Sequence, residues 1–275
     1  MIIKRQYEKN QSFEAFRSLL KSDMPFQKGR VIKVLSAINK DKLNNVLISA
    51  LKDLNDSGKA SLFKINQYIS DELSRIEDKE IARYICHRYR YDVYPKIKGL
   101  DEFPPYLQIE PASVCNYRCV FCYQTDKSFN SAKSGYMGFM SFSLFKKIIG
   151  QIEGNIEFLS IASRGEPMLC PDVNKMLLFC RGKFLGLKLN TNGSKLSEEN
   201  CHAILSGGVN TVVFSVDAVD KKSYEKFRVN GDFEKVLNNI KLFKKIKKSD
   251  YPKSKIITRI SGVSFSKDQN IDAMS

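Results

Sequence analysis

The first hundred residues carry apolar side chains at helical spacing. Leucine, isoleucine and tyrosine recur every three or four residues over three stretches, at 43–54, 63–73 and 81–89. This spacing is typical of amphipathic helices that bury one face. We predict an all-helical N-terminal domain over residues 1–98. Because such stripes ordinarily form the core of a helical domain, we assign no binding role to them.

The pattern changes near residue 95. Four residues, Pro95, Gly99, Pro104 and Pro105, predict a non-helical linker, because proline lacks the N–H group that a helix interior needs. Beyond the linker, short apolar runs predict five strands, at 106–110, 156–162, 185–190, 209–216 and 256–263. The helices expected between the strands begin after polar capping residues, which are Ser141 or Ser143, Asp172, Ser197 and Asp232.

Strand and helix alternate throughout this second part of the chain. Such an order is typical of a parallel sheet joined by right-handed crossovers. We therefore predict an α/β fold in residues 99–275, a partial (β/α) barrel whose functional groups follow the carboxyl ends of the strands. The sequence ends soon after the fifth predicted strand, so we expect the barrel to be truncated and its C-terminal part to be missing.

The charge of the chain changes this picture little. The formal net charge is +15, and a basic surface can attract nucleic acid, anionic lipid or phosphorylated small molecules. The densest lysine run, at 241–248, lies on the polar side of a predicted amphipathic helix, so we interpret the charge as a solvated surface and do not favour nucleic acid. No window reaches the run of about 18 apolar residues of a membrane helix. No apolar signal region follows Met1, so we expect a cytoplasmic protein without a membrane span.

Three of the seven cysteines, Cys115, Cys119 and Cys122, lie within eight residues and follow the first predicted strand. Three thiolates in one loop suit a soft metal centre, either iron–sulfur or zinc. A structural zinc site usually has four ligands, and the two histidines, His87 and His202, are remote in the sequence. Three ligands on a four-iron cluster would leave one iron open to a substrate or cofactor.

The spacing CxxxCxΦC, with aromatic Phe121 before the last cysteine, resembles the signature of the radical S-adenosylmethionine (radical SAM) superfamily. The resemblance implies that the three cysteines hold a 4Fe–4S cluster whose open iron chelates S-adenosylmethionine. In that family the reduced cluster cleaves the cofactor to methionine and a 5′-deoxyadenosyl radical, which abstracts hydrogen from the substrate. The resemblance covers about residues 106–265.

The later strands are followed by motifs similar to those of the family. Arg164-Gly165-Glu166-Pro167 resembles the GGEP motif that receives the methionine ammonium, with Arg164 where the family often has glycine. Asn190-Thr191-Asn192-Gly193 resembles the TNG element, and Ser215-Val216-Asp217 resembles the SxD element of the SPASM-type members. Arg228 lies in a stretch similar to their YEKIR helix and would pair with the methionine carboxylate. The cofactor-binding residues that the resemblance implies are Tyr117, Phe121, Gly165, Glu166, Pro167, Asn190, Asn192, Ser215, Asp217 and Arg228.

These motifs predict an enzyme that starts a radical reaction on an unknown substrate, which is a peptide, a sugar or a small metabolite. The basic charge weakly favours an anionic substrate. An electron donor such as flavodoxin or ferredoxin is then needed. The C-terminal extension of the SPASM-type members is not present in the sequence. Two alternatives stay open: an iron–sulfur protein for electron transfer or sensing, and an inactive truncated fragment of a radical SAM enzyme.

Overall fold

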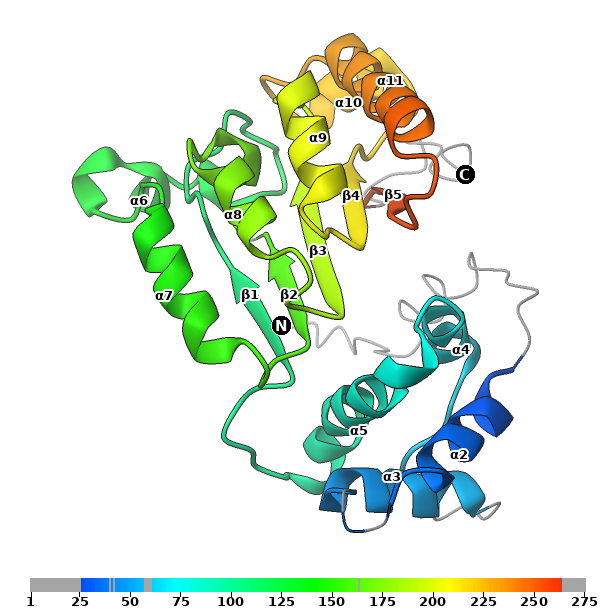
Figure 1. The fold of residues 1–275 in the computed structure, drawn as a ribbon. Helices are drawn as coiled ribbons and strands as arrows, with labels where there is room; N and C mark the ends of the chain where they lie inside the picture. The colour runs from blue at the N-terminus through cyan, green and yellow to red at the C-terminus, as the bar shows by residue number, and fades with distance from the viewer. Residues whose placement is uncertain (1–25, 40, 42, 57–60, 163, 264–275) are drawn as a thin grey trace, which may run out of the picture. The chain divides into compact units, whose positions relative to one another are not determined.

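The structure is a computed structural model, and it describes residues 26–263 apart from 40, 42, 57–60 and 163. The chain divides into two compact units, Met1–Leu100 and Asp101–Ser275 (Figure 1). The helical prediction for residues 1–25 lies outside the described residues. Each unit buries an apolar core of its own side chains.

The first unit is helical in its described part. Its elements are α2 (Lys28–Ser36), α3 (Asn45–Asn55), α4 (Gln67–Leu73), the short 3-10 helix η2 (Asp78–Glu80) and α5 (Ile81–Ile97). Asn44 and Asn66 begin α3 and α4, because their side chains accept hydrogen bonds from the backbone N–H groups of Leu47 and Ile69. The apolar stripes of the sequence point inward and form the core of this unit.

Two details of the first unit correct the prediction. Phe63 and Ile65 are buried but precede α4, because the cap at Asn66 fixes the start of that helix. Pro95 lies inside α5 and not in a linker. It is tolerated in the last turn, where its missing N–H group costs a single helical hydrogen bond. The helix ends only at Lys98, whose φ of 53° is left-handed.

The second unit is built on a parallel sheet with the order β1-β2-β3-β4-β5. The strands are β1 (Tyr106–Ile109), β2 (Phe158–Ile161), β3 (Gly186–Thr191), β4 (Thr211–Ser215) and β5 (Ile257–Ser261). The crossover helices are α7 (Phe142–Ile152), α8 (Val173–Phe179), α9 (Glu198–Ser206) and α11 (Phe233–Asp250). Each strand pairs with the next along the chain, as in a (β/α) barrel. The predicted partial barrel is therefore confirmed for the described residues.

Short helices occupy the loops at the carboxyl ends of the strands. They are η3 (Tyr123–Thr125), α6 (Lys127–Asn130), η4 (Ala132–Ser134), η5 (Pro167–Leu169) and α10 (Lys221–Phe227). Of the predicted caps, Ser141, Ser197 and Asp232 are confirmed at the starts of α7, α9 and α11. Asp172 precedes α8 without capping it, because its carboxylate pairs with Lys175 at 2.8 Å instead.

The two faces of the sheet differ in polarity. The crossover helices cover one face (Figure 1). On that face the strands bury apolar side chains, which include Ile109, Leu159, Ile161, Leu187, Leu189, Val212 and Phe214. Because side chains alternate along a strand, the residues between them point to the opposite face, which we call the inner face. Its rows, from the amino to the carboxyl ends of the strands, are Phe158–Gly186, Ser160–Lys188–Thr211–Ile257, Asn190–Val213–Arg259 and Ser215–Ser261.

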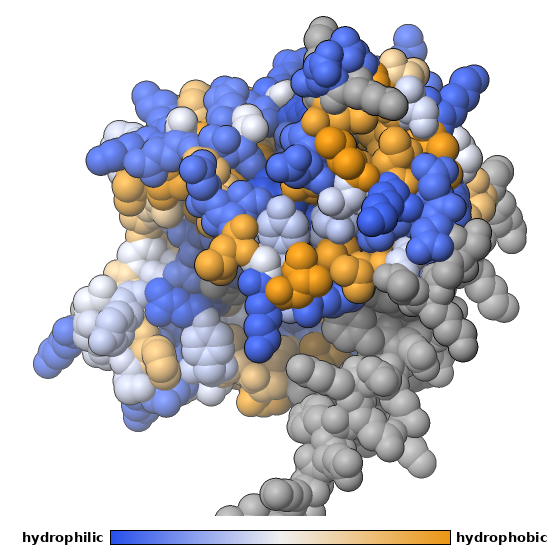
Figure 2. All heavy atoms as spheres, turned by 90° about the horizontal axis from the view of Figure 1, so that it is seen from below, coloured by the Kyte–Doolittle hydropathy of each residue, from blue (hydrophilic) through white to orange (hydrophobic). Residues whose placement is uncertain are grey.

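The surface of the described residues is mixed in polarity. On the face shown in Figure 2, hydrophobic side chains form patches that hydrophilic ones interrupt. Large apolar side chains with high exposure include Phe26, Leu100, Val120 and Tyr136. Among the helices that the structure describes, none combines the length and the apolar character needed to cross a membrane.

Candidate active site

The three clustered cysteines lie in the loop that follows β1, and we call residues 115–122 the cysteine loop. Cys119 is buried, Cys115 and Cys122 are half-buried, and all three are free thiols. Within the described residues, no three His, Cys, Asp or Glu side chains converge closely enough to hold a single metal ion. A 4Fe–4S cluster asks for a wider arrangement, since each cysteine binds a different iron of the cluster.

The thiols of the cysteine loop are poorly solvated. Burial raises the pKa of Cys119 to about 11 and also raises the pKa of Cys115. The Arg228 guanidinium opposes this rise at Cys119, with Nη1 lying 3.9 Å from Sγ. Cys115 and Cys122 are close enough to Cys119 to disfavour its ionisation. Binding to a soft metal would remove the protons and compensate the buried thiolates, so the donor set fits an iron–sulfur cluster.

The end of α10 holds one side of the cysteine loop. The backbone N–H of Val120 donates to the Phe227 carbonyl at 3.0 Å. The Tyr224 hydroxyl donates to the hydroxyl of buried Tyr117 at 3.3 Å. The Tyr117 ring packs in the apolar core of the unit, so its observed contacts are structural. A contact between Tyr117 and the cofactor stays a prediction.

Arg228 follows α10 and is only 7% exposed. Its Nη2 lies 2.5 Å from the Asp217 carboxylate, and its guanidinium carbon lies 5.8 Å from the centroid of the Phe121 ring. The Nε of Arg228 is buried and makes no hydrogen bond to any described residue. A guanidinium beside Cys119 and Phe121 with a donor still unused fits the carboxylate of an amino-acid ligand.

Asp217 follows β4 in a left-handed conformation, with a φ of 65°. Its Oδ1 accepts a hydrogen bond from the Val263 N–H at 2.8 Å, and its other oxygen faces Arg228. The structure thus brings Asp217 and Arg228 together beside the cysteine loop. The two residues contact each other in the absence of a ligand, which the sequence motifs do not indicate.

The Glu166 carboxylate joins the loop after β2 to the loop after β3. It accepts hydrogen bonds from the Thr191 hydroxyl and the Asn192 N–H at 2.6 Å each, and from the Met168 N–H at 3.0 Å. Burial raises the pKa of Glu166, and these three hydrogen bonds oppose the rise. The observed role of this side chain is therefore to position two loops, and its contact with a methionine ammonium stays a prediction.

Gly165 allows the loop after β2 to touch the backbone before the cysteine loop. A Cβ at this position would lie 1.8 Å from the carbonyl oxygen of Ala112 and 2.7 Å from that of Val114. The next residue, Glu166, donates its backbone N–H to the Val114 carbonyl at 2.9 Å. Only glycine fits such a close approach. Pro167 follows and begins η5.

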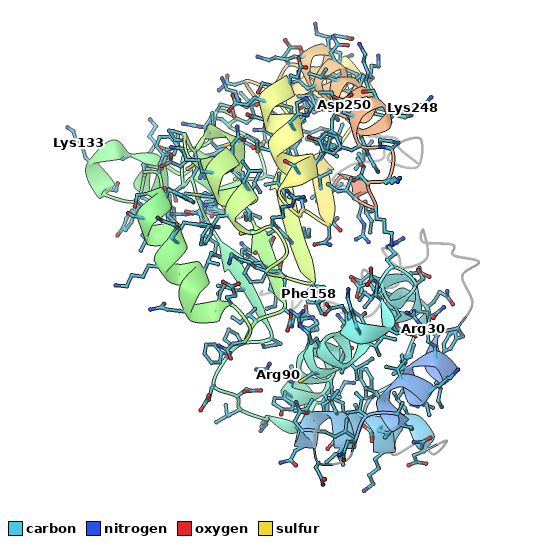
Figure 3. The ribbon with its side chains drawn as sticks, in the orientation of Figure 1. Arg30, Arg90, Lys133, Phe158, Lys248 and Asp250 are labelled. Atoms are coloured by element: carbon cyan, nitrogen blue, oxygen red, sulfur yellow. The ribbon has the colours of Figure 1, made fainter. Side chains whose placement is uncertain are left out.

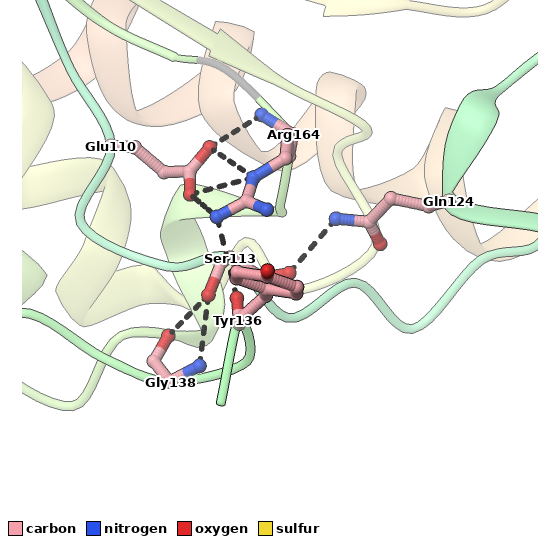
Figure 4. A network of polar contacts seen from close by, with 6 residues as sticks. All are labelled: Glu110, Ser113, Gln124, Tyr136, Gly138 and Arg164. Carbon is pink, nitrogen blue, oxygen red and sulfur yellow. Dashed lines mark hydrogen bonds and ion pairs between the residues drawn. The ribbon is translucent and has the colours of Figure 1, made fainter. Parts of the chain in front are cut away.

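Arg164, which departs from the family's motif, is engaged by the protein. Its guanidinium forms an ion pair with Glu110 at 2.9 Å, and its backbone N–H donates to the same carboxylate at 2.8 Å. Its Nη2 also donates to the Tyr136 carbonyl at 3.3 Å (Figure 4). Nearby, Gln124 donates its Nε2 to the Ser113 carbonyl at 2.8 Å. These contacts fix the segment that leads into the cysteine loop.

Two residues of the site escape the sequence motifs. Asn192 donates its Nδ2 to the Asn116 Oδ1 at 3.1 Å, and Asn116 donates its Nδ2 to the Ser194 hydroxyl at 2.9 Å. Asn116 and Ser194 thereby tie the cysteine loop to the loop after β3. Their signal in the sequence is weak, since each is a single polar residue beside a motif.

Two predicted residues lie on the inner face of the sheet. Ser215 ends β4 in register with Ser261, and Asn190 lies in register with Val213. Among the described residues, no hydrogen bond joins either side chain to the cysteine loop. The Oδ1 atom of Asn190 is buried and has no hydrogen-bond partner in the described part of the chain.

Comparisons with known proteins agree with this arrangement. The family model of the radical SAM superfamily matches residues 109–272. The chain is 30% identical over 138 residues to an uncharacterised protein of Methanocaldococcus jannaschii, which covers 50% of this chain and 43% of that protein. It is 27% identical over 150 residues to the AdoMet-dependent heme synthase of Methanosarcina barkeri, which covers 54% of this chain and 41% of the relative. The chain thus spans less than half the length of these curated relatives.

A solved structure shares the fold. The structure of Streptococcus suis SuiB bound to its precursor peptide SuiA superposes with a TM-score of 0.51 at 19% sequence identity. The superposition covers 72% of this chain and 42% of SuiB. The family match extends over more than half of the chain and includes the cysteine loop and the segments that surround it. The chain therefore belongs to the radical SAM superfamily, whose cofactors are a 4Fe–4S cluster and S-adenosylmethionine.

Proposed function

We propose that this chain is a radical SAM enzyme in which Cys115, Cys119 and Cys122 hold the 4Fe–4S cluster. The observation that carries the proposal is the buried Arg228, which lies beside Cys119 and Phe121 with its Nε unpartnered among the described residues. When bound, the cofactors supply a 5′-deoxyadenosyl radical that removes a hydrogen atom from the substrate.

The residues of the chain bind and orient these groups. Arg228 takes the methionine carboxylate, and Asp217 holds the guanidinium in place. Phe121 provides an apolar surface for the adenine. The loop at Gly165, Glu166 and Pro167 lies close to the backbone that precedes the cysteine loop, and its backbone carbonyls take the methionine ammonium. The second predicted set, Asn190, Asn192 and Ser215, contributes polar groups around the cofactor and the substrate.

We also propose how the two parts of the chain divide the work. The cofactors bind to the barrel domain, residues 99–275, and the helical domain, residues 1–98, is an accessory domain. The substrate is a peptide, a sugar or a small metabolite, and a flavodoxin or ferredoxin supplies the electron. All seven cysteines are free thiols, which supports a reducing compartment such as the cytoplasm.

An anaerobic assay of cofactor cleavage tests the proposal. The cluster is reconstituted, dithionite and S-adenosylmethionine are added, and 5′-deoxyadenosine is measured by mass spectrometry. We expect the product with the unaltered chain and none with Cys119→Ala. Cys86→Ala is the matched control, because Cys86 lies in α5 of the other unit, and it should retain the product.

Two outcomes would contradict the proposal. If Cys119→Ala keeps its iron and its brown absorption, the cysteine loop does not hold the cluster. If the cluster forms but 5′-deoxyadenosine never appears, the chain is better described as an iron–sulfur protein for electron transfer or sensing.

A further inference from the structure

Two cations lie together on the inner face of the sheet. Lys188 on β3 and Arg259 on β5 are separated by β4, in which Thr211 pairs with Lys188 and Val213 pairs with Arg259. Arg259 is thus one inward-facing position closer to the carboxyl ends of the strands. The spacing between neighbouring strands is about 4.8 Å, so the two long side chains can reach the same bound group. Both residues are half-buried.

Neither cation forms an ion pair within the described residues. Other partly buried cations of the second unit do so: Arg164 with Glu110, Lys183 with Glu153 and Arg228 with Asp217. Burial lowers the pKa of Lys188, and repulsion from Arg259 lowers it further. Two half-buried positive charges that repel each other cost free energy, which a bound anion would recover.

The groups around this pair are polar and leave a hydrogen-bonding atom unused. Asn190 lies in the same row as Arg259, and its Oδ1 is buried without a partner among the described residues. A side-chain amide can turn to present either its oxygen or its NH₂ group to a ligand. Towards the amino ends of the strands, a Cβ on Gly186 would lie 2.4 Å from the Phe158 ring, so this ring bounds the polar positions (Figure 3).

We propose that Lys188 and Arg259 bind an anionic group of the substrate, a carboxylate or a phosphate, on the inner face of the barrel. The proposal rests on the proposed function, because the loops after β1 to β4 place the cofactor site at the carboxyl ends of the same strands. The planar guanidinium of Arg259 matches two oxygens of either group, and the Lys188 ammonium adds a point charge. Ser215 lies one row closer to the carboxyl ends, so the anchored substrate would extend from the pair towards the cofactor.

A labelling experiment tests the pair without the cofactors. Pyridoxal 5′-phosphate carries an aldehyde that condenses with a lysine amine, with loss of water, and borohydride then fixes the adduct. The full chain is labelled and the modified lysines are mapped by mass spectrometry, with pyridoxal as the probe that lacks the phosphate. We expect Lys188 to react at least about tenfold faster with the phosphorylated probe than with pyridoxal. Exposed Lys241 should show no such preference.

Variants and competing anions sharpen this test. Arg259→Gln should bring the ratio of the two labelling rates at Lys188 close to one, whereas Arg181→Gln, an exposed arginine outside the inner face, should leave the ratio unchanged. Protection of Lys188 by inorganic phosphate identifies a phosphate site, and protection by succinate identifies a carboxylate site. The proposal is overturned if Lys188 shows no preference for the phosphorylated probe, if Arg259→Gln keeps that preference, or if neither anion protects. Because the labelling needs neither cluster nor S-adenosylmethionine, such a failure is distinct from a failure to form 5′-deoxyadenosine.

Discussion

The Asp217 carboxylate lies 2.5 Å from Nη2 of Arg228, and this ion pair joins the end of β4 to the end of α10. Asp217 is 1% exposed and Arg228 is 7% exposed. A buried ion pair adds little net stability, but the loss of one partner leaves an uncompensated charge. The pair therefore keeps a guanidinium inside the protein, next to Cys119, where a cofactor carboxylate can reach it.

Replacement of the carboxylate alone should destabilise the second unit. Asp217→Asn removes the charge but keeps a residue that tolerates the left-handed φ of 65°. We expect the free energy of unfolding to fall by about 3–5 kcal/mol, as measured by urea denaturation. Asp220→Asn is the matched control, because Asp220 caps α10 from an exposed position and asparagine caps about as well. Equal stabilities of the two variants would show that the buried charge is not compensated by Asp217.

Removal of both charges should separate stability from cofactor binding. Asp217→Asn combined with Arg228→Gln leaves no buried charge, so we expect it to regain most of the stability that Asp217→Asn loses. Binding of S-adenosylmethionine to the reconstituted protein should nevertheless fall by at least about tenfold, because the guanidinium is gone. Equilibrium dialysis with labelled cofactor measures this binding. Unchanged affinity in the double variant would assign Arg228 a purely structural role.

Two glycines of the second unit should respond in opposite ways to alanine. In Gly165→Ala, the new Cβ would lie 1.8 Å from the Ala112 carbonyl oxygen, so the loop after β2 must move away from the cysteine loop. We expect a loss of at least about 3 kcal/mol in stability and a lower iron content after reconstitution. Gly150→Ala, in the exposed part of α7, meets no atom within 4 Å and should gain up to about 1 kcal/mol. Iron content is measured by colorimetric assay, and equal iron in both variants would contradict the assigned packing.

The order of elements in the second unit could be predicted because each one has a local cause. Strand residues such as Leu187 and Leu189 bury one face and alternate with polar ones. The caps at Ser197 and Asp232 satisfy backbone N–H groups within three residues of themselves. The sites of chemistry followed from the order of strands, since the carboxyl ends of parallel strands meet at one edge.

The contacts within the site could not be predicted, because they join distant parts of the chain. Nothing local to Glu166 indicates that Thr191 and Asn192 occupy its carboxylate. The pairing of Lys188 with Arg259 across β4 depends on strand register, which the sequence pattern does not fix between separate strands. The helical position of Pro95 likewise depends on how α5 ends, against the local preference of proline.

The three hydrogen bonds to Glu166 make a sharp prediction for Glu166→Gln. In either orientation, the glutamine NH₂ group would face a backbone N–H, that of Asn192 or that of Met168. Two opposed donors in a buried site should cost about 1–3 kcal/mol in the free energy of unfolding. Glu153→Gln changes an exposed carboxylate paired with Lys183 and should cost under about 1 kcal/mol. If urea denaturation gives similar values for both variants, the Glu166 carboxylate does not bridge the two loops.

A chain reduced to residues 101–275 should still take up the cluster. Every contact described for the cysteine loop, from Ser113 to Arg228, comes from residues of the second unit, and this unit has its own core. The helical unit supplies no cysteine to the loop, since its one cysteine is Cys86. We therefore expect the iron content and the visible absorption of the reconstituted shorter chain to match those of the full chain. Circular dichroism checks that the shorter chain is folded. A folded chain that takes up no iron would show that the helical unit belongs to the cluster site and is not an accessory domain.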